Sequence, residues 1–200
     1  MSRLVVLVAD SNAEETVEEL LSRSEALGIR SPACTVQTHP RHDPGVWNEG
    51  VEFLREVAKP DDHVLMLFDR EGSGQENQTA EQIEDALESR LRQAGWADRA
   101  GAVVIDPELE VWVWSDSPQV GRALGMTEPE YQQLRSRNAS GPTGKPRQPK
   151  ELLRSTLRSN RLPRSPSIFR ELARTVSFER CTDRAFLKLR TLLRQWFPAA

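Results

Sequence analysis

Acidic side chains follow the apolar segments in the first half of the chain, in a pattern that suits binding of a divalent cation. The positions that form this pattern are Asp10, Glu14, Asp69, Glu71, Asp106, Glu108 and Glu110. Mg²⁺ and Mn²⁺ prefer oxygen ligands, and a bound ion can activate water or stabilise the leaving oxygen of a phosphodiester. The acids therefore predict a Mg²⁺ (or Mn²⁺) site, in which Asp69, Glu71 and Glu108 are the candidate catalytic residues.

A structural role for the same acids is the alternative interpretation. Aspartate is common in turns and at helix N-termini, where its side chain accepts hydrogen bonds from backbone N–H groups. The turn at residues 72–74 comes shortly after Asp69, but it lacks the lysine and the spacing of a P-loop. The metal-site hypothesis therefore depends on whether the elements that carry the acids bring them together in space.

Alternating apolar and amphipathic segments predict those elements. Four apolar runs are expected to be strands, over residues 3–9, 33–38, 63–68 and 101–105. Helices are expected between the strands, among them 46–58 and 77–94. This rhythm is typical of an α/β fold, and we expect a Rossmann-like, mainly parallel four-stranded sheet flanked by helices. Ligands of such sheets bind beyond the carboxyl ends of the strands, where most of the acids fall.

The segment after the fourth predicted strand has two interpretations. Residues 108–114 are expected to form a tryptophan-containing helix. The alternation of valine and tryptophan over 111–114 also fits a strand.

Positive charge is concentrated in the last third of the chain. Residues 131–200 hold 16 of the 27 Lys and Arg residues but only 4 of the 30 Asp and Glu residues. Such asymmetry indicates either a surface that meets DNA or RNA, or basic helices that pack on the acidic part and neutralise it. Both interpretations stay open. The side chains expected to contact phosphate are Lys145, Arg147, Lys150, Arg154 and Arg158.

The domain organisation follows from the same division. We expect an α/β core over residues 1–130 and a basic helical extension over 131–200 that packs on the core within one structural domain. Helices of the extension are expected over residues 149–159, 166–176 and 182–196. The longest apolar run is far shorter than the roughly 18 residues of a membrane span, so a cytoplasmic protein without membrane contact is expected.

Several short stretches resemble a known family. The stretch 106–116, DPELEVWVWSD, is similar to a signature of a Toprim-like bacterial family without an assigned activity. The first strand with its acidic helix, and the strand that ends in Asp69-Arg70-Glu71, resemble the Toprim fold of topoisomerases, primases and overcoming-lysogenisation-type nucleases. Segments 144–153 and 181–189 are similar to later parts of that family, and the whole chain resembles a small component of methylation-associated phage-defence systems.

The resemblance implies two functions. One is a Mg²⁺-dependent phosphodiester-cleaving or nucleic-acid-processing protein of anti-phage defence, that is, a metal-dependent nuclease. The other is a catalytically inactive Toprim-like subunit that docks onto larger partners of the same defence system. Toprim proteins place a glutamate directly after the first strand, where this chain has Ala9 and Asp10, and an aspartate where it has Glu71. These departures keep the inactive alternative open.

Overall fold

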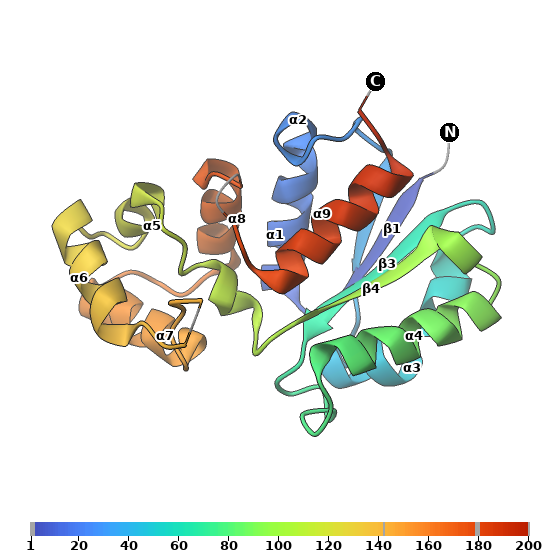
Figure 1. Ribbon diagram of the computed structural model, residues 1–200, viewed down its shortest axis with the longest axis horizontal. Helices are drawn as coiled ribbons and strands as arrows, with labels where there is room; N and C mark the ends of the chain where they lie inside the picture. Colours follow the sequence, from blue (N-terminus) through green and yellow to red (C-terminus); the bar gives the residue numbers. More distant parts are fainter. Residues whose placement is uncertain (1–2, 142, 179–180, 200) are drawn as a thin grey trace.

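The fold is built on a parallel β-sheet, seen in a computed structural model that describes residues 3–141, 143–178 and 181–199 (Figure 1). The strands in these ranges are β1 Leu4–Val8, β2 Cys34–Thr38, β3 His63–Asp69 and β4 Ala100–Ile105. They lie in the order β2-β1-β3-β4, and every neighbouring pair is parallel. The predicted class, a parallel four-stranded sheet flanked by helices, is therefore confirmed.

Helices connect the strands and make up most of the chain after β4. The α-helices described are α1 Ser11–Ser22, α2 Ser24–Leu27, α3 His42–Val57, α4 Ala80–Gln93, α5 Pro118–Ala123, α6 Glu128–Asn138, α7 Pro149–Ser159, α8 Pro166–Thr175 and α9 Arg184–Trp196. Two 3₁₀ helices accompany them, η1 Ala97–Arg99 and η2 Leu109–Trp112. Proline stands at the first or second position of α5, α6, α7 and α8, where its missing N–H costs no hydrogen bond. Across the described residues, no helix has the length and apolar character that crossing a membrane requires.

Both faces of the sheet are covered, because successive strand residues point to opposite sides. Val6 of β1 belongs to an apolar cluster with residues of α1, α8 and α9. Its neighbour Leu7 belongs to a second cluster with residues of α3 and α4. In Figure 1, α1 and α9 lie over one face and α3 and α4 over the other. Continuous apolar strands are typical of parallel sheets buried in this way.

The C-terminal helix α9 packs closely onto β4 because Gly101 has no side chain. A Cβ atom at this position would lie 2.6 Å from Cδ1 of Leu192, an approach that real Cβ atoms do not make. The predicted helix over 182–196 is thus present, and it covers the sheet from the far end of the chain.

Helices α5, α6 and α7 form a lobe to the left of α8 in Figure 1. The rings of Trp114 and Tyr131 are stacked there with their centroids 6.5 Å apart. Both side chains belong to the same apolar cluster as Val6 of β1, so the lobe shares its core with the sheet. Apolar periodicity does not reveal α6 in the sequence, because Tyr131 is its single buried residue.

The segment after β4 forms a shorter helix than predicted. Only Leu109–Trp112 is helical, as the 3₁₀ helix η2, and Glu108 is extended with φ −159°. Every residue from Glu108 to Val111 is buried, so this segment has no solvent face of the kind an amphipathic α-helix presents. Of the two interpretations, the helix is thus the one observed, but it covers only Leu109–Trp112 of the predicted 108–114.

The outer edge of β4 is closed by side chains rather than by another strand. Glu84 of α4 is 2% exposed, and its Oε1 accepts a hydrogen bond from the Val104 N–H at 2.8 Å. Arg184 of α9 donates to the Val104 carbonyl at 2.5 Å and to the Glu84 carboxylate at 2.8 Å. Lys188 donates to the same carboxylate at 3.0 Å. These bonds satisfy edge groups that would otherwise be open to pairing with another chain.

We expect Glu84→Ala to lower the free energy of unfolding by about 2–4 kcal/mol, because it leaves a buried N–H without an acceptor and removes the buried carboxylate that Arg184 and Lys188 share. The measurement is urea unfolding followed by circular dichroism. Glu81→Ala is the matched control, since Glu81 also contacts Arg184, at 3.2 Å, but its side chain is 58% exposed. It should cost less than about 1 kcal/mol. Equal losses in the two variants would contradict the role given to Glu84.

Candidate metal centre

Three carboxylates converge beyond the carboxyl ends of β3 and β4. Asp69 is the last residue of β3, and Glu108 and Glu110 lie at η2 just after β4. One oxygen from each can be chosen so that all three lie within 4.8 Å of one another. Asp69 is paired in register with Ile105, so the neighbouring parallel strands deliver these acids to one place. We call Asp69, Glu108 and Glu110 the carboxylate cluster.

Asp69 is held by backbone hydrogen bonds on two sides. Its Oδ1 accepts from the Leu109 N–H at 2.8 Å, which ties the start of η2 to the end of β3. Its own N–H donates to Oδ1 of Asp43 at 2.9 Å, in the first turn of α3. Asp43 is therefore a further acid at the site that the strand-end pattern does not identify, because it lies in a helix rather than after a strand.

Two basic side chains from the C-terminal third lie against the carboxylate cluster. Lys150 donates from Nζ to Oε2 of Glu108 at 2.9 Å and from its backbone N–H to Oε1 at 3.0 Å. Arg164 donates from Nη2 to Oε1 of Glu110 at 3.2 Å. The two glutamates are 6% and 2% exposed, so burying them as anions without such partners would be costly. Among the described residues, no basic side chain donates to Asp69.

Burial and like charge shape the acid–base properties of the site. Burial, and then the carboxylates of Asp43 and Glu110, raise the pKa of Asp69 well above the usual range of an aspartate. Burial is also the main cause that raises the pKa of Glu110 and of Asp43. Burial alone would lower the pKa of Lys150, but its hydrogen bond to Glu108 and the nearby carboxylates raise it. A cation bound among these acids would relieve their mutual repulsion.

Two predicted ligands near the start of the chain lie outside the carboxylate cluster. Oδ1 of Asp10 accepts a hydrogen bond from the Ala13 N–H at 2.9 Å and so caps α1. Glu14 accepts a hydrogen bond from Oγ1 of Thr38 at 3.2 Å. Asp10 still acts on the site electrostatically, because its charge contributes to the raised pKa of Asp69.

Two further predicted ligands are also kept apart from the carboxylate cluster. Asp106 accepts a hydrogen bond from Nε of Arg70 at 2.9 Å, in an ion pair across the β3 and β4 ends. The side chain of Glu71 is exposed. Of the predicted catalytic residues, the structure thus brings Asp69 and Glu108 together and leaves Glu71 at the surface.

The predicted phosphate contacts divide into two groups. Lys145 donates from Nζ to a backbone carbonyl 2.9 Å away, and Lys150 reaches the carboxylate cluster. Arg147, Arg154 and Arg158 are exposed. The exposed three therefore remain accessible to a polyanion, whereas the two lysines are engaged inside the protein.

Comparison of the chain with protein-family models, curated proteins and solved structures gives no match. The chemistry of the site is therefore inferred from its own residues. Its ligand set consists of carboxylates alone, which suits a hard cation such as Mg²⁺ or Mn²⁺ and not a zinc site built from cysteine and histidine.

The raised pKa of Asp69 predicts a stability change with a defined pH dependence. A pKa raised in the folded state means that ionising Asp69 costs stability as the pH rises through that pKa. The cost is absent below the unfolded value of about 3.9. We expect Asp69→Asn, which keeps an acceptor oxygen for Leu109, to raise the melting temperature by roughly 3–6 °C at pH 8 in EDTA. The gain should shrink toward zero near pH 4.

Differential scanning fluorimetry across this pH range measures the effect. Asp61→Asn is the control, because Asp61 is exposed, and it should differ little from the unmodified protein at any pH. A loss of stability in Asp69→Asn at pH 8 would mean that the charge of Asp69 is stabilised by its surroundings, contrary to the prediction.

Proposed function

We propose that this protein is a Toprim-like, Mg²⁺- or Mn²⁺-dependent protein that cleaves phosphodiester bonds or otherwise processes nucleic acid in bacterial anti-phage defence. The observation that supports it most directly is the convergence of Asp69, Glu108 and Glu110 at the carboxyl edge of the sheet. Ligands of open parallel sheets bind at this edge.

The carboxylate cluster and the residues beside it would have different roles. Asp69, Glu108 and Glu110 would hold the ion, which supplies Lewis acidity toward water and phosphate when bound. The Leu109 N–H orients the Asp69 carboxylate, so that its second oxygen is available to a ligand. Lys150 places a positive charge beside Glu108, where it would attract the phosphate of a substrate.

The exposed arginines would bind the backbone phosphates of the rest of the nucleic acid. Arg147, Arg154 and Arg158 lie at or near α7, whose N-terminal end also brings Lys150 to the carboxylate cluster. Arginines of this kind neutralise backbone phosphates without reading base sequence. Binding is therefore expected to weaken as the salt concentration rises.

We expect saturating Mg²⁺ or Mn²⁺ to raise the melting temperature of the protein. A metal added at ten times its dissociation constant stabilises by about 1.4 kcal/mol, which corresponds to roughly 3–6 °C for a chain of this size. Glu110→Gln and Asp69→Asn should remove this metal-dependent gain and any metal-dependent cleavage of DNA or RNA. Glu52→Gln, on the exposed side of α3, is the control and should keep both.

Isothermal titration calorimetry and cleavage assays on single- and double-stranded DNA and RNA make the measurement. Metal affinity should rise with pH, since the ion must displace the proton that the raised pKa of Asp69 favours. The proposal fails if the protein binds neither Mg²⁺ nor Mn²⁺ and cuts none of the substrates.

A non-catalytic docking subunit is the second candidate function. The ion pairs of Lys150 and Arg164 favour it, because they already neutralise Glu108 and Glu110 without a metal. The exposed arginines would then meet an acidic surface on a larger partner, such as a methyltransferase or an ATPase of the same defence system.

Reversing two exposed charges tests the docking function. If the protein is a docking subunit, the double variant Arg147→Glu with Arg158→Glu should lose co-purification with the partner, because like charges would then face each other. Asp69→Asn should retain it. A partner lost with Asp69→Asn and kept with the arginine variant would contradict docking through the basic surface.

A further inference from the structure

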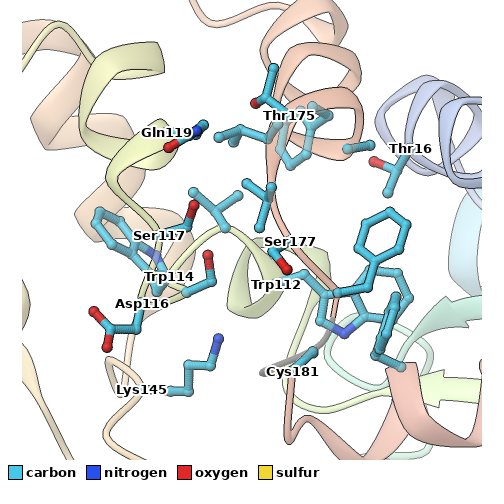
Figure 2. Close-up of a pocket in the computed structure, with 18 of the residues that line it drawn as sticks. Thr16, Trp112, Trp114, Asp116, Ser117, Gln119, Lys145, Thr175, Ser177 and Cys181 are labelled. Atoms are coloured by element: carbon cyan, nitrogen blue, oxygen red, sulfur yellow. The ribbon is translucent and has the colours of Figure 1, made fainter. Parts of the chain in front are cut away.

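A second concavity lies next to η2 and is separate from the carboxylate cluster. Its volume is about 550 Å³, within the range of roughly 300–1,000 Å³ that is usual for small-molecule sites. Residues of η2, α5, α8 and α9 line it, together with the segment that carries Lys145 (Figure 2). Among the described residues, its lining includes Leu109 but none of Asp69, Glu108 and Glu110.

One side of the cavity is apolar. Trp112 of η2 faces it together with side chains from the two C-terminal helices and the segment between them, among them Phe169, Leu172, Phe178 and Phe186. The indole N–H of Trp112 already donates to Oδ1 of Asp183 at 2.8 Å, so its ring contributes apolar surface to the cavity. This wall suits a flat, apolar body.

The other side of the cavity is polar, and several of its atoms lack partners. Oγ of Ser115, Oε1 of Gln119 and Nε of Arg135 are shielded from solvent, yet no described group forms a hydrogen bond with them. All three residues line the cavity. Buried polar atoms are nearly always hydrogen-bonded, so these three are unusual. They have almost no accessible surface and lie behind the cavity wall, so the polar contact that a ligand can reach comes from other groups, above all Lys145.

Lys145 brings to the cavity a positive charge that has no ion-pair partner among the described residues. Arg135 donates to Oδ1 of Asp116 at 2.5 Å, so the charges of that pair offset each other. The Lys145 ammonium extends toward the middle of the cavity in Figure 2, and it donates to the neutral carbonyl of Val111 at 2.9 Å. No carboxylate in the described ranges forms an ion pair with it. Burial lowers the pKa of Lys145, because the charged ammonium is less well solvated there. An anionic ligand would offset this loss of solvation.

We propose that this cavity binds a small organic anion, a carboxylate or a phosphate ester with an apolar and planar body. The anionic group lies at Lys145 and the planar body packs on Trp112. The site does not depend on the function proposed for the carboxylate cluster, because the two sets of side chains do not overlap.

Anilinonaphthalene sulfonate is a suitable probe, because it joins a planar apolar body to an anionic group. Titration into the folded full-length protein, followed by energy transfer from tryptophan, should give binding at one site. Lys145→Met should weaken it about tenfold or more through loss of a charge-assisted bond. Thr175→Trp, which fills the cavity from α8 without removing core side chains, should abolish it. Lys59→Met, at an exposed lysine, should leave it unchanged.

Three further measurements complete the test. N-phenylnaphthylamine, which lacks the sulfonate, should bind the protein and the Lys145→Met variant equally. Displacement of the probe by phenylpropionate or by phenyl phosphate shows which anionic group the cavity prefers. Asp69→Asn should bind the probe normally even where it loses metal binding. The proposal is overturned if the folded protein does not bind the probe, or if Lys145→Met and Thr175→Trp bind it as tightly as the unmodified chain.

Discussion

Ion pairs link the acidic first two-thirds of the chain to its basic last third, beside the apolar core that packs α8 and α9 on the sheet. The pairs are Glu15–Arg170, Glu84–Arg184, Glu84–Lys188, Glu88–Lys188, Glu108–Lys150, Glu110–Arg164 and Asp116–Arg135. Exposed pairs contribute little to stability, so the ones at the buried Glu84, Glu108 and Glu110 matter most. These pairs use six of the 16 basic residues after position 130, and other arginines, such as Arg147 and Arg158, are exposed at the surface.

The parallel arrangement of the strands accounts for the like charges that gather in the carboxylate cluster. Parallel strands end at one edge, so acids that follow neighbouring strands reach the same side of the sheet, where Asp69, Glu108 and Glu110 converge. Lys150 and Arg164 form ion pairs with the two glutamates, whereas Asp69 has no ion-pair partner among the described residues. Burial and neighbouring acids raise the pKa of Asp69, although the charge of Lys150 acts to lower it. A divalent cation would offset the remaining negative charge of the cluster, and this is the electrostatic basis of the proposed metal site.

One short 3₁₀ helix contributes to both candidate sites. Glu108 and Glu110 at η2 belong to the carboxylate cluster, whereas Leu109 and Trp112 line the cavity with the unpartnered polar atoms. The hydrogen bond from the Leu109 N–H to Asp69 joins this segment to the sheet. Because every residue from Glu108 to Val111 is buried, the segment can serve two sites at once, which an amphipathic helix with a solvent face would not do.

The sequence by itself determined the strands, most of the helices, and the edge at which acids gather, because burial on both faces leaves continuous apolar runs and strand ends carry polar turns. It identified Asp69, Glu108 and Glu110 but also Asp106, which the tertiary structure pairs with Arg70. Only the tertiary structure decided which acids converge, which basic side chains meet them, and where the cavity lies. A local pattern reports how a segment is buried, whereas these sites join segments that are far apart in the chain. The cavity, for example, is lined by Thr16 of α1 as well as by Phe186 of α9.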